Sequence, residues 1–316
     1  MISVADVKEA RKRISSIIHE TPIFQSTLLS KLCGNNVFLK GEHLQKTGSF
    51  KIRGATNKVK VAVKEGAKLL TTASSGNHGQ AVAYIANELE VPATIVVPED
   101  INSSKEAAIQ AYRGKVEKCG MTSNERLPRA IQIAEEKEGV YVPPYDDPYI
   151  IAGQGTIALE LLEQIDDIDM ILVPIGGGGL VSGILTAIKQ LKPEIQVIGV
   201  EPEVAKDTYL SLQKGEITSI EETTSIADGL RTSQPGDVTF PIIHKYIDDI
   251  VLVSENSIKQ AMFLALERTK QLIEPSSAVT IAAAMYNKIN VSNKNIVCVI
   301  SGGNVDLQNF RTYMPN

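Results

Sequence analysis

Short β-branched apolar runs alternate with longer amphipathic stretches along most of this chain. That alternation is typical of strand–helix units laid onto a mainly parallel sheet. The pattern predicts strands over residues 68–73, 94–97, 140–142, 170–175, 196–200, 250–253 and 296–300. It predicts helices over residues 79–89, 104–113, 127–137, 156–164, 180–191, 257–272 and 278–287. The predicted fold class is therefore α/β.

One turn-rich segment, VPPYDDP at residues 142–148, interrupts this alternation. It is the best candidate for a crossing between two domains, and we expect the return crossing between residues 54 and 68. The sequence thus predicts a large domain of residues 1–60 and 147–316, with a small domain of residues 61–146 inserted into it. A ligand is expected in the cleft between the two.

Composition narrows the class of protein. A hydrophobic fraction of 43% over 316 residues can support a large core, which argues against disorder. With 32 Lys and Arg against 37 Asp and Glu, the net charge of −5 offers no basic surface for nucleic acid or an anionic membrane. The three cysteines, Cys33, Cys119 and Cys298, are too scattered for a disulfide framework, which fits a reducing compartment.

The chain shows no recognisable targeting or membrane segment. Its first residues, MISVADVKEARKR, carry charges where a signal peptide needs an apolar stretch. The most apolar window, residues 170–188, contains one proline and five glycines and is better interpreted as strand, turn and helix. We therefore expect a soluble cytoplasmic protein.

Four consecutive glycines, Gly176 to Gly179, follow a predicted strand and precede an apolar helix. Without side chains the backbone can close around an anion, and the helix N-terminus adds donors and a positive dipole end. A flexible turn is the alternative. The dinucleotide pattern G-x-G-x-x-G fails here because Val181 and Ser182 stand at the third glycine position, and no GK[ST] follows. Glu201, at the end of the next strand, is the only support for NAD. The run therefore favours a small phosphate monoester.

A lysine between apolar neighbours is the second candidate. Lys51 follows the cap-like residues TGS and lies between Phe50 and Ile52 at a predicted helix start. Burial lowers the pKa of a lysine and makes the amine a usable nucleophile, whereas an ordinary surface lysine is the alternative. A phosphate loop and a partly buried lysine are together the two features that pyridoxal phosphate requires.

Two further small-residue turns follow predicted strands. SSGNHG, residues 74–79, offers backbone N–H groups, hydroxyls and an amide suited to a carboxylate, although an ordinary helix cap uses the same residues. SGGN, residues 301–304, is weaker by itself. The four histidines form no HExxH motif, and no GxSxG elbow supports a serine hydrolase.

The segments KTGSFKIRGA, SSGNHGQA, AGQGTIALE, PIGGGGLVSG and SGGNVD occur in an order and spacing that resembles the serine racemase and serine/threonine dehydratase family. The resemblance runs from residue 21 to residue 304. It implies a pyridoxal-phosphate enzyme of the tryptophan-synthase-β-like fold (fold type II), with two open, twisted, mainly parallel sheets and flanking helices. The racemase side is the closer match, because Ser75 stands where many dehydratases have alanine.

The resemblance also implies roles for single residues. Lys51 would attach the cofactor and act as the base on one face of the substrate, with the Ser75 hydroxyl on the other. The implied cofactor-binding residues are Lys51, Phe50, Asn77, Gly176, Gly177, Gly178, Gly179, Gly229 and Ser301. The implied receptors of the substrate carboxylate are Ser74, Ser75, Asn77 and His78.

A possible metal site lies in EPEVAKD. Glu201, the Ala205 carbonyl and Asp207 offer the oxygen ligands that Mg²⁺ or Ca²⁺ prefers. From the residues alone, a solvated acidic loop is the simpler interpretation. The resemblance to racemases at all three positions instead implies a structural metal ion.

These observations together predict dehydration and deamination of L-threonine and L-serine to a 2-oxo acid and ammonia, with serine racemase activity, in a homodimer. One alternative is another β-hydroxy amino acid, such as 3-hydroxyaspartate or a compound derived from hydroxyectoine. An alternative of another class is an NAD(P)-binding oxidoreductase that uses the glycine run and Glu201. A third is a phosphate-ligand binding protein without catalysis.

Overall fold

The computed structural model describes residues 2–286, 288–308 and 310–314. Within them, the larger of two sheets has the strand order β1-β2-β10-β7-β8-β9, and only β1 is antiparallel to its neighbour. Its strands are β1 (Ile23–Gln25), β2 (Asn36–Gly41), β7 (Met170–Pro174), β8 (Gln196–Pro202), β9 (Asp249–Val253) and β10 (Asn295–Ile300). The sheet thus pairs a strand from the N-terminal part of the chain, β2, with one from the C-terminal part, β10.

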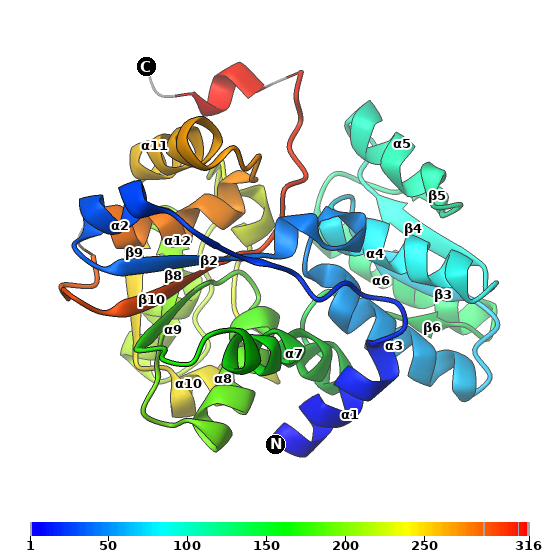
Figure 1. The fold of residues 1–316 in the computed structure, drawn as a ribbon. Helices are drawn as coiled ribbons and strands as arrows, with labels where there is room; N and C mark the ends of the chain where they lie inside the picture. The colour runs from blue at the N-terminus through cyan, green and yellow to red at the C-terminus, as the bar shows by residue number, and fades with distance from the viewer. Residues whose placement is uncertain (1, 287, 309, 315–316) are drawn as a thin grey trace.

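The smaller sheet lies beside the larger one and is entirely parallel, in the order β5-β4-β3-β6 (Figure 1). Its strands are β3 (Leu70–Ala73), β4 (Ala93–Val97), β5 (Lys115–Lys118) and β6 (Val140–Tyr141). The α/β class with two mainly parallel sheets is therefore confirmed. All four strands fall inside residues 61–146, but the domain boundaries themselves stay a prediction.

Helices flank both sheets. They are α1 (Val4–Ile14), α2 (Thr27–Cys33), α3 (Lys51–Lys64), α4 (Asn77–Glu88), α5 (Ser103–Ala111), α6 (Ser123–Glu136), α7 (Pro148–Gln164), α8 (Gly179–Leu191), α9 (Asp207–Lys214), α10 (Thr239–Tyr246), α11 (Glu255–Leu264) and α12 (Pro275–Met285). The N-terminal helix α1 was not predicted, although it has a capping box between Ser3 and Asp6 and buries Val7, Ala10 and Ile14.

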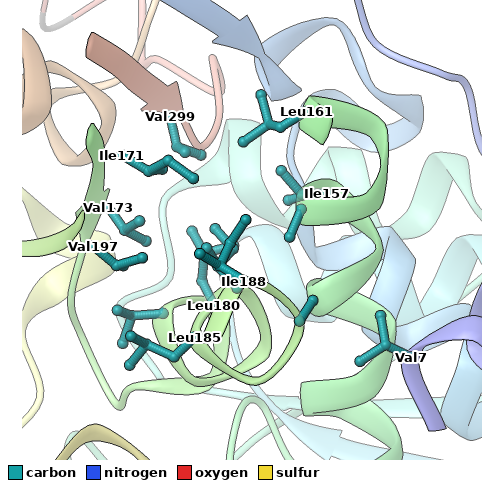
Figure 2. Packing of buried hydrophobic residues seen from close by; sticks show 14 of the residues in the cluster. Val7, Ile157, Leu161, Ile171, Val173, Leu180, Leu185, Ile188, Val197 and Val299 are labelled. Atoms are coloured by element: carbon teal, nitrogen blue, oxygen red, sulfur yellow. The ribbon is translucent and has the colours of Figure 1, made fainter. Parts of the chain in front are cut away.

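The main core lies between the larger sheet and helices α7 and α8. Helix α8 is buried from Gly179 to Ile188, and its Leu185 and Ile188 pack towards side chains of the sheet such as Val173 and Val197 (Figure 2). Fully burying one such side chain stabilises the fold by about 1.5–3 kcal/mol. This packing holds the N-terminus of α8, and therefore the glycine run before it, against a rigid sheet.

The prediction that a helix begins at residue 156 was wrong. Helix α7 begins at Pro148, because the Asp147 side chain accepts hydrogen bonds from the N–H groups of Tyr149 and Ile150. The glycines that obscured this helix are needed for packing. A Cβ at Gly153 would lie 2.6 Å from the Cα of Gly54 in α3. Helices α7 and α3 can approach this closely only where both have glycine. The crossing matters for the site because Lys51 is the first residue of α3.

Three other predictions need correction or restriction. Strand β5 was missed because its sequence, KVEK, lacks an apolar run, which is common for an edge strand. The helix predicted over 257–272 ends as an α-helix at Leu264, then forms one π-helical turn, and Lys270 adopts a left-handed φ of 61°. The last residue of the helix predicted over 278–287 lies outside the described residues.

Candidate active site

A cavity of about 440 Å³ lies where strands of both sheets end. The loops that follow β3, β7 and β10 line it, and all three leave the carboxyl ends of parallel strands, where α/β proteins bind ligands. The cavity brings together every residue predicted to bind cofactor or substrate: Phe50, Lys51, Ser74, Ser75, Asn77, His78, Gly176, Gly177, Gly178, Gly179, Gly229 and Ser301. The predicted metal ligands lie outside this lining.

Lys51 is held at the cavity by its own helix. Its Nζ donates a hydrogen bond to the carbonyl of Pro144 at 2.7 Å and lies 5.3 Å from the centre of the Phe50 ring. Burial lowers the pKa of Lys51 to about 8, although the negative charge of Glu274 opposes the shift. A substantial fraction of the amine is therefore neutral near pH 7–8 and can act as a nucleophile or a base.

A buried ionic network fixes the first turn of α3. Arg53 has no exposed surface, and its guanidinium donates to Glu42 at 2.7 Å and to Glu160 at 2.9 Å. Lys40 donates to the same Glu160. The sequence analysis missed this network, because its members come from β2, α3, α7 and the turn after β2 and share no local pattern. Because Arg53 is anchored in this network, the backbone of Lys51, two residues earlier in the same helical turn, is held in place.

The glycine run forms a cradle that fits a phosphate group. A Cβ at Gly177 would lie 2.4 Å from the ring of Tyr145, and one at Gly179 would lie 2.9 Å from the Cβ of that tyrosine. Gly178 has a φ of 89°, and a Cβ there would lie 2.8 Å from Oγ1 of Thr239. The first N–H groups of α8 have no acceptor within the helix. Backbone donors around a space that side chains would fill are what a phosphate ester requires.

Asn77 is already engaged at both ends of its amide. Its Nδ2 donates to the two carboxylate oxygens of Glu274 at 2.9 and 3.1 Å, and its Oδ1 accepts from Asn304 at 2.8 Å. Glu274 was missed in the sequence. Burial, and then the charge of Asp228, raise its pKa to about 7. An acidic residue within an apolar stretch directly before a helix-starting proline was the signal that could have identified it.

The His78 side chain faces the protein backbone. Its Nε2 lies 3.0 Å from the carbonyl of Val142, and burial, with the charge of Lys51, lowers its pKa to about 3. The imidazole is therefore neutral and donates to Val142. If a substrate carboxylate binds at this turn, the first N–H groups of α4 and the Ser74 and Ser75 hydroxyls are better placed to meet it than the imidazole.

A second serine lies behind Ser301. The hydroxyls of Ser277 and Ser301 are 3.0 Å apart, and Ser277 also donates to the carbonyl of Gly302 at 2.7 Å. This pair fixes the position of the buried Ser301 hydroxyl at the cavity wall. The neighbouring Ser276 accepts a hydrogen bond from the N–H of Gly229 at 3.0 Å. Ser276 and Ser277 lie in the first turn of α12, which begins at Pro275, three residues before the predicted helix start.

The predicted metal ligands form a separate buried group. Glu201, Ala205 and Asp207 have no exposed surface, which contradicts the interpretation of this segment as a solvated loop. Burial, and then the charge of Asp207, raise the pKa of Glu201 to about 8, and burial raises that of Asp207 to about 7. Among the described residues no cluster of three or more His, Cys, Asp or Glu side chains forms. The oxygens of two buried carboxylates are nevertheless the kind of ligand that a divalent cation prefers.

The same geometry removes the one observation that favoured a dinucleotide. Both carboxylate oxygens of Glu201 accept hydrogen bonds from backbone N–H groups of α9, those of Thr208 at 3.1 Å and Tyr209 at 2.8 Å. Glu201 is buried outside the cavity and is not placed to bind a ribose there.

Comparisons with known proteins agree with this geometry. The family described as pyridoxal-phosphate dependent enzyme matches residues 14–302. An L-threonine ammonia-lyase of Thermotoga maritima is 41% identical over 308 residues, which cover 97% of this chain and 77% of that protein. Serine racemase of Homo sapiens is 44% identical over 321 residues, 99% of this chain and 94% of that protein.

A solved structure, that of maize serine racemase, superimposes with a TM-score of 0.95 at 37% identity and covers 98% of this chain and 96% of that one. The described part of the chain contains no helix that is both long enough and apolar enough to cross a bilayer.

Proposed function

The chain belongs to the family of pyridoxal-phosphate dependent enzymes, and on that premise we propose that it dehydrates and deaminates L-threonine and L-serine and also racemises serine. The observation that carries this proposal is the position of Lys51, with its lowered pKa, in the same cavity as the glycine cradle. The products of dehydration are a 2-oxo acid and ammonia.

The residues of the cavity fit pyridoxal phosphate. Lys51 would hold it covalently, the backbone of Gly176–Gly179 would bind its phosphate, and Ser301 would face the ring nitrogen. Phe50 would pack beside the ring. When bound, the cofactor supplies an electron-withdrawing system that makes the proton on the substrate α-carbon acidic.

Lys51 then moves the essential proton. Its Nζ, neutral in a substantial fraction near pH 8, takes the proton from the α-carbon. The electron pair left behind would form a double bond to the β-carbon, and the β-hydroxyl would leave as water by taking the proton that Lys51 then holds. Hydrolysis of the released unsaturated amine gives the 2-oxo acid and ammonia.

Racemisation needs a second proton-transferring group on the opposite face of the α-carbon. Ser75 lines the cavity in the turn after β3, and we propose that its hydroxyl is that group. Elimination from the L-substrate needs Lys51 alone. Ser75→Ala should therefore lose D-serine formation and D-serine dehydration, while L-threonine dehydration remains substantial. Equal losses in all reactions would instead assign Ser75 to binding or to helix capping, which is worth about 1 kcal/mol.

The outer cavity favours an uncharged substrate side chain. Lys105 is paired with Asp228 at 2.8 Å, and the Arg126 guanidinium donates to the carbonyl of Met121 and the hydroxyl of Ser123. Arg231, the third cation of this part of the lining, donates from Nε to the carbonyl of Ser225 at 2.6 Å. Because all three cations already have acceptors, a second substrate carboxylate would compete with protein partners. This supports threonine or serine over 3-hydroxyaspartate.

A substrate panel tests the proposal directly. The purified protein, supplied with pyridoxal phosphate, should absorb visible light and form 2-oxobutanoate from L-threonine and pyruvate from L-serine. Chiral analysis should detect D-serine. A protein that acquires no visible absorption, or one that acts only on 3-hydroxyaspartate, would contradict it.

Three further assignments are part of the proposal. Glu201, the Ala205 carbonyl and Asp207 would hold Mg²⁺ or Ca²⁺, which their burial and raised pKa values support. The names of the relatives support a small amino acid as substrate, and a homodimer stays part of the proposal. The charge and cysteine content support a cytoplasmic location.

A further inference from the structure

The segment that connects β6 to α7 contacts the glycine cradle. We call residues 143–147 the crossover segment. Its Tyr145 ring packs against Gly177, and its Pro144 carbonyl accepts from Lys51. The next residue, Asp146, has no role in the chemistry proposed above, yet its carboxylate is fully engaged with the protein.

Asp146 caps a distant helix. Its carboxylate oxygens accept hydrogen bonds from three successive backbone N–H groups, those of Asp237 at 3.0 Å, Val238 at 2.8 Å and Thr239 at 3.2 Å. These groups begin α10, where the N-cap residue Val238 supplies no side-chain acceptor. A carboxylate suits a helix N-terminus both as an acceptor and as a negative charge.

The first residue of α10 in turn holds the cradle. Thr239 has no exposed surface, and its Oγ1 donates to the carbonyl of Gly177 at 2.8 Å. The same Oγ1 accepts from the N–H of Gly236 at 3.0 Å. A trans peptide points its C=O and the following N–H in opposite directions. With the Gly177 carbonyl held by Thr239, the N–H of Gly178 must point away from Thr239.

We propose that Asp146 is a positioning residue for the phosphate cradle and acts through α10 and Thr239. By fixing the start of α10, Asp146 sets the position of Thr239, and Thr239 sets the orientation of the Gly177–Gly178 peptide. The N–H of Gly178 is thereby presented to an anion. The inference rests on the proposed binding of the cofactor phosphate at Gly176–Gly179, and it makes Asp146 part of the support of that site.

The chain offers a matched control one residue away. Asp147 belongs to the same segment and carries the same charge, but it caps α7 and pairs with Lys58 at 2.7 Å. Asp147→Ala therefore removes a helix-capping carboxylate without touching α10 or the cradle. A general loss of stability in the crossover segment would appear equally in Asp146→Ala and Asp147→Ala.

The test compares pyridoxal 5′-phosphate with pyridoxal, which has the same ring and aldehyde but no phosphate. Dissociation constants for both are measured from the visible absorption that develops at Lys51 in wild type, Asp146→Ala, Thr239→Val, Thr239→Ser and Asp147→Ala. The ³¹P chemical shift of the bound cofactor is recorded for each variant. Thermal unfolding of each protein without cofactor reports its stability separately.

Asp146→Ala and Thr239→Val should each weaken binding of the phosphate ester by roughly tenfold, equivalent to ~1.4 kcal/mol, while binding of pyridoxal is unchanged. A variant that combines Asp146→Ala with Thr239→Val should bind the phosphate ester no more weakly than either single variant, because both substitutions break the same chain of contacts. Both should shift the ³¹P resonance. Thr239→Ser, which keeps the hydroxyl, and Asp147→Ala should retain wild-type preference for the phosphate ester.

Each of the following results would overturn the inference. Equal weakening of both ligands in Asp146→Ala, or the same loss in Asp147→Ala, would reduce Asp146 to a general structural role. An unchanged preference in both Asp146→Ala and Thr239→Val would do the same. A wild-type protein that binds pyridoxal as tightly as its phosphate would instead refute the cradle assignment itself, and the inference with it.

Discussion

Arg53 and Glu201 are both completely buried, but they differ in their partners. Arg53 forms ion pairs with two carboxylates, whereas Glu201 forms none with the described residues. Arg53 and Lys40 balance Glu42 and Glu160 in one hydrogen-bonded network. Burial alone would raise the pKa of Glu160, but Arg53 and Lys40 outweigh it and hold that pKa below its ordinary value. The opposite holds for Glu201, whose pKa burial and Asp207 raise to about 8.

Buried charges with ion-pair partners therefore differ in role from buried charges without them. In a balanced buried network each charge has a close partner, and the network fixes backbone, here the start of α3. Buried groups without a close opposite charge, such as Lys51 and Glu201, can change protonation state or accept a ligand near neutral pH. We therefore expect substitutions in the first set to act on stability and those in the second to act on chemistry or ligand binding.

The largest effect should follow removal of the unbalanced lysine. Lys51→Ala should abolish the visible absorption of the bound cofactor and lower turnover by about 10³-fold or more, because no other amine occupies its position. The free energy of unfolding of the cofactor-free protein should be no lower than that of wild type. Absorption spectra, product formation and denaturant unfolding measure the three quantities. An unchanged spectrum and rate would refute the pyridoxal-phosphate assignment for Lys51.

Breaking the balanced network should destabilise the protein without a specific chemical signature. Arg53→Met leaves Glu42 and Glu160 buried with only Lys40 to offset them, and should lower the free energy of unfolding by about 3–5 kcal/mol. Arg11→Met is the matched control, because the Arg11–Glu163 pair is partly exposed and worth about 0–1 kcal/mol. Similar losses in both variants would remove the distinction between buried and exposed pairs here.

A divalent cation bound by Glu201 and Asp207 should stabilise the folded protein. Mg²⁺ or Ca²⁺ at 100 times its dissociation constant should stabilise the fold by about 2.7 kcal/mol, and a chelator should reverse the effect. Glu201→Gln should weaken this response, whereas Glu203→Gln, at an exposed neighbouring position, should not. Melting temperatures with metal and with chelator measure it. If they are identical in wild type, the metal assignment is wrong.

The smallest effect concerns how Glu274 tunes Lys51. Only the neutral amine attacks the cofactor aldehyde, so the rate of cofactor capture should rise with pH, with its midpoint at about pH 8. The Glu274 charge raises the pKa of Lys51, and Glu274→Gln should therefore move this midpoint to lower pH. Glu267→Gln, at an exposed position, serves as control. Stopped-flow absorbance measures the profile, and a midpoint that stays in place or rises would contradict the interaction.

Much of the site could be predicted because it is built from local motifs. The glycine run, the SSGNHG turn and the SGGN turn each follow an apolar strand, so their place at strand ends was visible in the sequence. The apolar neighbours of Lys51 alone still favoured a surface lysine, and only the glycine run and the family resemblance made it a candidate. The helix start at Pro148 was missed although Asp147 caps it locally, because glycines follow in the next two turns. Gly153 lowers helix propensity locally but permits the close crossing with α3.

What the sequence by itself determined was most of the parallel strands and their alternation with helices, the acidic net charge, and the candidate residues that carry their chemistry in a short motif. Only the tertiary structure decided which distant charges meet. Arg53 finds Glu160 across 107 positions, Asp146 caps α10 across 93, and Asn77 reaches Glu274 across 197. Hydrophobic periodicity reports which face of an element is buried, but it contains no information on the partner of a buried polar group. That partner is set by the crossing of elements far apart in the chain, and so are the pKa values on which the proposed function depends.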